Sequence, residues 1–219
     1  MVRAVHLGVA MAIEHAFDDD DLFDHQLPRR VQLKSSVHFT PVAVGKYAAR
    51  LLAPRPGMRV LDVGAGPGKF CVIAAREVPT ATFVGVEMRP HLVHMARKLA
   101  SRAGVENVRF VNANAMDIAW AEFDAFYFYN PFAEHLHDGR FALDQSLGSD
   151  PSKFLEYVTG ARQRLAVARI GTRVVTYHSF GAPAPHGYDL IESHAIGTDR
   201  LELWVKTSQP AGAERDAIS

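Results

Sequence analysis

Three glycines at alternating positions mark the part of this sequence best suited to hold a ligand. Residues 60–63 read Val-Leu-Asp-Val, and Gly64, Gly66 and Gly68 follow at every second position. Glycine has no Cβ, so a ligand can lie directly against the backbone of such a loop. A helical pattern begins after the loop, and the first turn of a helix offers unpaired N–H groups. The pattern therefore predicts a binding site made of a strand, a glycine loop and a helix N-terminus.

An acid stands at the position where the next strand should end. Residues 81–86 are mainly apolar, and Glu87 follows them. In nucleotide-binding βαβ units, an acid at this place accepts hydrogen bonds from the two hydroxyl groups of a ribose. The two features together favour a ligand that contains a nucleoside.

Alternating strands and helices must position these residues. Apolar runs predict strands at residues 59–63, 82–87, 108–112, 125–129 and 172–178. Apolar residues at helical spacing predict helices at residues 42–52, 69–77, 90–103 and 152–167. Two further strand-like runs, 189–196 and 200–206, have only three residues between them. They must pair antiparallel, because a parallel pair needs a long crossover.

Repeated strand–helix units form a parallel sheet that helices cover on both faces. We therefore expect an α/β fold, a three-layer doubly wound arrangement with a mostly parallel seven-stranded sheet and a C-terminal antiparallel hairpin. Ligands in such sheets bind beyond the carboxyl ends of the strands. This topology would bring Asp62, Glu87, Asn114 and Asn130 to one crevice.

The composition is that of a globular protein with one well-buried domain. The 219 residues are 48% hydrophobic, and 24 basic residues balance 24 acidic ones. A net charge of zero argues against broad electrostatic capture of nucleic acid, although a local basic patch is compatible with it. The single cysteine, Cys71, excludes a disulfide framework within the chain. No apolar run is long enough to span a bilayer, so we expect a cytoplasmic protein without a membrane partner.

The order Asp-x-Gly-x-Gly-x-Gly at residues 62–68 resembles the first motif of class I S-adenosylmethionine-dependent methyltransferases. Glu87 is similar to the ribose-binding acid of that family, and a closing antiparallel hairpin distinguishes its fold from the dehydrogenase fold. The resemblance covers roughly residues 36–207. It implies S-adenosylmethionine as the cofactor and S-adenosylhomocysteine as the product, with the glycine loop facing the methionine part. An ordinary dinucleotide-binding fold is the alternative.

The resemblance also implies the remaining cofactor contacts. Asn114 and Ala115 stand where the family often has an acid and a small residue that contact the adenine amino group, and an Asn carbonyl can accept that bond. Thr40 belongs to a Phe-Thr-Pro sequence similar to one in adenine-N6 methyltransferases, where the Thr lies near the cofactor carboxylate; a plain helix start explains it equally well. The expected cofactor-binding residues are Thr40, Asp62, Gly64, Ala65, Gly66, Gly68, Glu87, Met88, Asn114, Ala115 and Asn130.

The end of the fourth predicted strand bears on the methyl acceptor. Asn130-Pro131-Phe132 resembles the (Asn/Asp)-Pro-Pro-(Tyr/Phe) element of amino-group methyltransferases, with one proline fewer, and the Asn-Asn-Phe element of non-SET histone-lysine methyltransferases. Both comparisons imply a nitrogen acceptor; a simple turn in which Phe132 packs is the alternative. An ammonium acceptor must first lose a proton, and the candidate proton acceptors are His135, His137, Tyr129 and His178. The expected catalytic residues are Asn130, Pro131, Phe132, Tyr129 and His135.

These features predict an S-adenosylmethionine-dependent methyltransferase that acts on a nitrogen, either a protein lysine or another amino group. A protein or small-molecule acceptor is preferred, and nucleic acid is disfavoured by the neutral charge. The alternatives are a methyltransferase of a small molecule or nucleic acid, a catalytically inactive cofactor-binding protein, and a nicotinamide-dependent oxidoreductase. No metal site is expected, because the histidines at 135 and 137 have no evident third ligand.

The expected organisation has three parts. Residues 1–35 form an N-terminal helical extension or arm, residues 36–207 the methyltransferase domain, and residues 208–219 a disordered tail. The stretch 133–151 is long for a strand-to-helix connection. We interpret it as a substrate lid, with a passive surface excursion as the competing interpretation.

Overall fold

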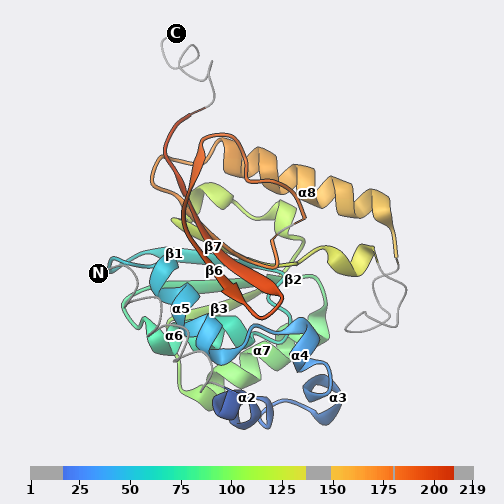
Figure 1. Cartoon of the computed structure of the whole chain (residues 1–219). Coiled ribbons are helices and arrows are strands. Elements are labelled where there is room, and N and C mark those ends of the chain that lie inside the picture. Colours follow the sequence, from blue (N-terminus) through green and yellow to red (C-terminus); the bar gives the residue numbers. More distant parts are fainter. Residues whose placement is uncertain (1–16, 137–148, 180, 210–219) are drawn as a thin grey trace.

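The computed structural model of the chain describes residues 17–136, 149–179 and 181–209 (Figure 1). The described strands form one seven-stranded sheet in the order β3-β2-β1-β4-β5-β7-β6. Their bounds are β1 Arg59–Val63, β2 Thr82–Glu87, β3 Val108–Asn112, β4 Ala125–Tyr129, β5 Arg173–Tyr177, β6 Tyr188–Ile196 and β7 Asp199–Lys206. The first five pair in parallel, and β7 lies antiparallel to both β5 and β6. The predicted mostly parallel sheet with a C-terminal hairpin is confirmed.

Strand β1 lies between β2 and β4 in the interior of the sheet, and all of its residues after Arg59 are buried. Val63, its last residue, pairs with Val86 of β2 on one side and Phe128 of β4 on the other. The carboxyl ends of β1, β2 and β4 therefore meet at one edge of the sheet. Such parallel, doubly covered strands are nearly continuous apolar runs, which is why the sequence pattern located them well.

Helices cover both faces of the sheet. Helices α5 (Val42–Leu52), α6 (Lys69–Glu77) and α7 (Pro90–Ala103) share one apolar core with the side chains of Val60 and Phe83. Helix α8 (Pro151–Ala166) packs on the other face, where Leu61 and Phe128 belong to a second core. The alternation of Val60 and Leu61 between the two cores follows from the period of two in a strand. The predicted three layers are present.

A short helical segment precedes this domain. Helices α2 (Phe17–Asp24), α3 (Arg29–Gln32) and α4 (Ser35–His38) lead into α5 (Figure 1). The side chain of Lys69 at the start of α6 is buried, and its Nζ lies 2.6 Å from Oδ1 of Asp20 and 2.8 Å from Oδ1 of Asp24. Asp20 also accepts a hydrogen bond from the backbone N–H of Val42, the first residue of α5. The extension is thus tied to the helix that follows the glycine loop.

Several expectations fall partly or wholly outside the described residues. These are the larger part of the proposed lid, His137, residues 1–16 of the extension and residues 210–219 of the tail. The domain boundaries therefore stay a prediction. Within the described ranges, no helix combines the length and apolar character that a membrane span requires. The same part of the chain holds no cluster of three or more side chains able to bind a metal ion.

Candidate cofactor and acceptor site

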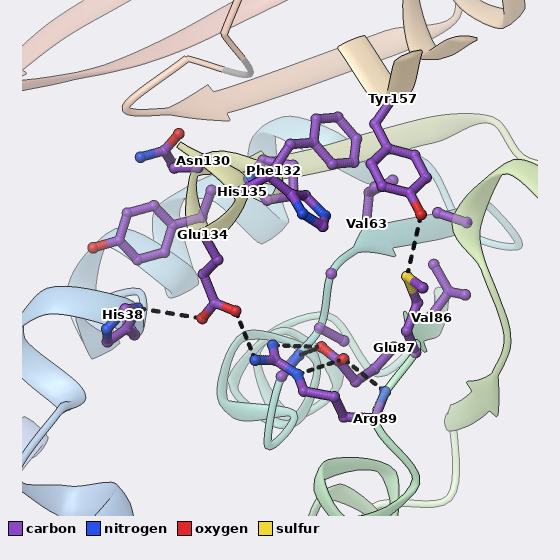
Figure 2. Close-up of a pocket in the computed structure, with 18 of the residues that line it drawn as sticks. His38, Val63, Val86, Glu87, Arg89, Asn130, Phe132, Glu134, His135 and Tyr157 are labelled. Atoms are coloured by element: carbon purple, nitrogen blue, oxygen red, sulfur yellow. Dashed lines mark hydrogen bonds and ion pairs between the residues drawn. The ribbon is translucent and has the colours of Figure 1, made fainter. Parts of the chain in front are cut away.

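A cavity of about 390 Å³ opens beyond the carboxyl ends of β1, β2, β4 and β5 (Figure 2). It lies where the topology of an α/β sheet places a ligand. Most of the residues singled out in the sequence line it. They are Gly64, Ala65, Gly66, Glu87, Met88, Asn114, Ala115, Tyr129, Asn130, Pro131, Phe132 and His135.

The glycine loop forms one wall of the cavity. Gly64 has a φ of 80° and Gly66 a φ of 54°, which are left-handed conformations that favour glycine. A Cβ on Gly66 would meet only Cε1 of Phe39, at 3.9 Å, so the space beside this residue is open. A Cβ on Gly64 would lie 3.0 Å from Cβ of Pro131, which shows how closely the loop approaches the end of β4. The loop is therefore a cradle that an added side chain would fill.

A chain of charged side chains crosses the cavity from Glu87. The carboxylate of Glu87 accepts hydrogen bonds from the backbone N–H of Gly66 at 3.1 Å and from Nε of Arg89 at 2.9 Å. Nη1 of Arg89 then lies 2.7 Å from Oε2 of Glu134, and Oε1 of Glu134 lies 3.9 Å from Nδ1 of His38 (Figure 2). These contacts link the end of β2 to the segment after β4 and to α4.

Aromatic side chains form the wall beside Met88 and Asn114. The ring of Tyr157 from α8 stacks on Phe132 with centroids 5.4 Å apart, and its hydroxyl lies 3.7 Å from Sδ of Met88 (Figure 2). The side-chain carbonyl of Asn114 accepts a hydrogen bond from the backbone N–H of Met116, so it caps a short 3-10 helix. Phe132 is buried, as the packing alternative predicted, yet one part of it still faces the cavity. Tyr157 is thus a wall residue that the sequence pattern did not single out.

The opposite end of the cavity is built on strained backbone. Asn130 has a φ of 42° and His178 a φ of 62°, although neither is glycine. Both follow the last residues of neighbouring parallel strands, and the backbone N–H of Asn130 donates to the carbonyl of Ser179 at 3.3 Å. Non-glycine residues in this region are uncommon and cluster at functional sites. The ends of β4 and β5 therefore form the part of the site where the acceptor was predicted.

The candidate proton acceptors differ in their surroundings. Burial raises the pKa of the Tyr129 hydroxyl, which donates a hydrogen bond to the carbonyl of Val37, so Tyr129 is poorly suited to take a proton. His135 is buried on the cavity wall, and its Nδ1 has no hydrogen-bond partner among the described residues. His178 also lines the cavity, and burial lowers its pKa.

Three of the predicted cofactor-binding residues do not line the cavity. Thr40 is buried and shares a 2.7 Å hydrogen bond with the hydroxyl of Tyr127. Asp62 is buried behind the loop, where it accepts a 3.3 Å hydrogen bond from Sγ of Cys71. A Cβ on Gly68 would lie 2.7 Å from the side chain of Ala96, so this glycine permits close packing between the loop and α7. The glycine spacing in the sequence did not distinguish this packing role from a ligand-binding one.

Arg89, Glu134 and Tyr157 line the cavity and were absent from the predicted site, and His178 lines it too but was predicted only as a candidate proton acceptor. They belong to a loop, a short 3-10 segment, the buried face of α8 and the end of β5. Only His178 gave a signal in the sequence, as a histidine at a predicted strand end. The other three have neighbours that only the tertiary structure brings together.

A comparison with protein families settles the class of this fold. A family model described as a methyltransferase domain matches residues 54–164, just over half of the 219 residues. The chain belongs to this methyltransferase family. The predicted class I methyltransferase, with S-adenosylmethionine as its cofactor, is confirmed at the level of the family. The matched region runs from the turn before β1 into α8 and includes the glycine loop and Glu87.

Individual relatives share shorter stretches with this chain. Arsenite methyltransferase of Halobacterium salinarum is 42% identical over 59 residues, which cover 26% of this chain and 15% of that protein. The tRNA (guanine(6)-N2)-methyltransferase of Thermus thermophilus is 34% identical over 116 residues, 51% of this chain and 34% of that protein. The matches therefore span only a minor part of the length of either relative.

Solved structures share the fold. An RNA methyltransferase from Salinibacter ruber, in complex with S-adenosyl-L-homocysteine, superposes with a TM-score of 0.53 and 23% identity. The match covers 76% of this chain and 93% of that one. At this level of identity the likeness concerns the arrangement of the sheet and helices.

Proposed function

We propose that this protein transfers the methyl group of S-adenosylmethionine to a nitrogen of a nucleic-acid base, with RNA as the substrate class. The proposal keeps the nitrogen acceptor predicted from the sequence and replaces the protein lysine with a base. The comparisons support this alternative, because one relative is a tRNA guanine-N2 methyltransferase and one structural neighbour is an RNA methyltransferase.

The observation that carries the proposal is that aromatic and polar side chains meet at the acceptor end of the cavity. The ring of Tyr129 lies 5.1 Å from that of His178, and both rings line the cavity next to Asn130. Bases of single-stranded RNA stack on aromatic rings such as that of Tyr129 and are read by hydrogen bonds along their edges. The Asn130 amide offers one donor group and one acceptor to the edge of a base.

Two exposed basic side chains lie close in sequence to residues of the cavity wall. Arg29 and Arg30 are exposed on α3, in the segment that leads directly to Val37 and His38 on the cavity wall. Exposed arginines near an acceptor site can contact phosphates of a nucleic acid. A local patch of this kind does not require an overall positive charge.

Different residues along the cavity would bind different parts of the cofactor and the acceptor. S-adenosylmethionine supplies an electrophilic methyl group on its sulfonium sulfur. The Gly64 and Gly66 backbone would lie against the methionine part, and Glu87 would hold the ribose. Tyr157, Met88 and the Phe132 ring would cover the adenine and exclude water. Asn130 would orient the acceptor nitrogen, so that the reacting atoms meet in line.

The test is transfer of a radiolabelled methyl group into fractions of an extract from source cells that lack this gene. The extract is separated after reaction into RNA, DNA, protein and small molecules. The proposal predicts label in RNA. Label in protein would support the lysine hypothesis instead, and label in small molecules would support an acceptor of that kind. Absence of label from every fraction would contradict an active methyltransferase.

The matched variant for this assay is Asn130→Gly. Glycine accepts a φ of 42° without strain, so the backbone keeps its path while the amide is lost. We expect the rate of labelling to fall at least tenfold while the affinity for S-adenosylhomocysteine stays within about twofold. An unchanged rate would place the acceptor away from the end of β4.

A further inference from the structure

A histidine and an aspartate lie in close contact and form a dyad at the acceptor end of the cavity. Nδ1 of His178, directly after β5, lies 2.6 Å from Oδ1 of Asp199, the first residue of β7. Among the described residues, Asp199 is the sole hydrogen-bond or ion-pair partner of the imidazole ring. A neutral ring with its proton on Nδ1, beside the Asp199 carboxylate, carries its lone pair on Nε2.

The backbone at this histidine adopts an unfavourable left-handed conformation. His178 and Ser179 have φ values of 62° and 58°, and two consecutive non-glycine residues in this region are rare. The backbone N–H of His178 donates to the carbonyl of Arg200 at 3.4 Å, which ties the strained turn to β7. The hairpin of β6 and β7 therefore fixes both members of the dyad.

The groups around the ring favour a neutral imidazole. Burial lowers the pKa of His178 below its ordinary value, and the negative charge of Asp199 opposes this shift only in part. The other titratable groups that face the ring are the hydroxyls of Tyr129 and Tyr177, whose rings lie 5.1 Å and 4.7 Å from it. Burial raises the pKa of both hydroxyls, so neither adds a charge near neutral pH.

We propose that His178 is the general base of methyl transfer, with Asp199 as the residue that positions its ring. This step rests on the proposed function. The acceptor nitrogen gives its lone pair to the methyl carbon, and the carbon–sulfur bond breaks with its electron pair retained by sulfur. The N–H proton moves to Nε2 of His178 and then to solvent. Asp199 stabilises the imidazolium that forms, as in other base–carboxylate pairs.

The dyad also limits the kinds of nitrogen atom that can be the methyl acceptor. A ring nitrogen with a free lone pair, such as guanine N7, has no proton to lose and needs no base. An exocyclic amino group loses a proton whenever it is methylated. The dyad therefore selects a base nitrogen that bears a proton, such as an exocyclic amino group, as the acceptor rather than an unprotonated ring nitrogen.

The first test needs neither acceptor nor cofactor. NMR of ¹⁵N-labelled full-length protein, with His178→Asn to assign the signal, reports the tautomer and titration of the ring. We expect neutral His178 to carry its proton on Nδ1 and to titrate below the ordinary histidine range. Asp199→Asn should lower the titration point further, because the carboxylate no longer stabilises the imidazolium. A neutral ring protonated on Nε2 would overturn the dyad.

The second test measures labelling of the RNA fraction as a function of pH. Asn is among the few residues that tolerate a positive φ, so His178→Asn should fold. We expect a loss of about 100-fold or more in turnover, with the affinity for S-adenosylhomocysteine within twofold of wild type. The plot of turnover against pH should also lose the rise that accompanies deprotonation of His178. The control is His186→Asn, an exposed histidine outside the cavity, which should match wild type.

The two tests separate the possible failures. If RNA is not labelled but the tautomer and titration are as expected, the proposed function falls and the base can be retested on whichever fraction takes the label. If RNA is labelled and His178→Asn keeps its turnover within about threefold of wild type, the assignment of His178 as the general base is refuted. The proposed function is then retained.

Discussion

Arg89 contacts both carboxylate oxygens of Glu87, with Nε 2.9 Å from Oε1 and Nη2 3.3 Å from Oε2. The backbone N–H groups of Arg89 and Gly66 donate to the same two oxygens at 2.9 Å and 3.1 Å. A carboxylate has about four acceptor positions, so the hydrogen-bonding capacity of Glu87 is filled. Two ribose hydroxyls can bond to this carboxylate only if the Arg89 side chain releases part of it. Rearrangement of Arg89 is therefore expected to accompany cofactor binding.

Two isosteric substitutions separate the ribose contact of Glu87 from its ion pair. Glu87→Gln and Glu134→Gln each remove one negative charge from beside the Arg89 guanidinium. We expect both variants to lose about 1–3 kcal/mol of stability, since a largely buried charge loses a partner. Glu87→Gln should also weaken S-adenosylhomocysteine binding about 10- to 100-fold, measured by calorimetry, because hydrogen bonds to a charged group are lost. Equal affinities for the two variants would argue against Glu87 as the ribose acid.

A methyl group at the glycine loop should block the cofactor without unfolding the protein. Gly66→Ala places a Cβ in the open space beside Phe39. Gly104→Ala is the control, because Gly104 has a similar φ of 64° at the end of α7 and an added Cβ there meets nothing within 4 Å. Both variants should lose about 1–2 kcal/mol to backbone strain. Only Gly66→Ala should lose at least tenfold in affinity for S-adenosylhomocysteine. Comparable affinities of the two variants would refute the claim that the glycine loop binds the cofactor.

The ion pairs of Lys69 should hold the N-terminal extension on the domain. Lys69→Met keeps the side-chain length but leaves Asp20 and Asp24 without their buried partner. We expect a loss of about 3 kcal/mol in urea unfolding. Arg50→Met breaks the pair with Glu77, in which the Arg50 side chain is 57% exposed, and should lose at most about 1 kcal/mol. Similar losses would mean that the extension contributes little.

The pH dependence of stability should reveal the buried carboxyl of Asp62. Burial raises its pKa to about 7, against the opposing effect of the Cys71 hydrogen bond. The unfolded chain has an ordinary Asp pKa of about 3.9, so the folded state binds the extra proton between these values. The stability contributed by that proton is complete below about pH 4 and is lost as the pH rises to about 7.

The matched variant for this effect is Asp62→Asn, which keeps an oxygen for Cys71 and has no proton to lose. Wild-type stability relative to Asp62→Asn should fall by up to about 4 kcal/mol between pH 4 and pH 7. The measurement is urea unfolding of both proteins across this range. A constant difference would mean that Asp62 is ionised throughout.

The sheet could be predicted closely because its signals are local. Strand β1 and helix α7 have the bounds that apolar runs and helical spacing indicated. Helix α8 begins one residue earlier than predicted, at Pro151, because the Asp150 side chain caps the backbone N–H groups of Ser152 and Lys153. Each of these features depends on residues that are neighbours in the sequence.

The site could be predicted only where its residues stand at strand ends. Gly66, Glu87 and Asn130 follow from that rule, and all three line the cavity. Arg89 and Tyr157 do not follow from this rule. Arg89 contacts Glu134, which is 45 residues away in the sequence, and Tyr157 contacts Met88, which is 69 residues away. The net charge is a poor guide to a nucleic-acid acceptor of the kind proposed, because a sum over the chain conceals where the charges lie.

The most direct test of the account is the identity of the methylated product. RNA from source cells lacking this gene is incubated with the full chain and S-adenosylmethionine that carries a deuterated methyl group. The RNA is then digested to nucleosides for mass spectrometry. A deuterated methyl is expected on a base nitrogen that bears a proton, such as an exocyclic amino nitrogen, and its yield at limiting S-adenosylmethionine should fall when Gly66→Ala replaces the wild type. A deuterated methyl on an unprotonated ring nitrogen, on carbon or on ribose oxygen, or none in RNA, would contradict this expectation.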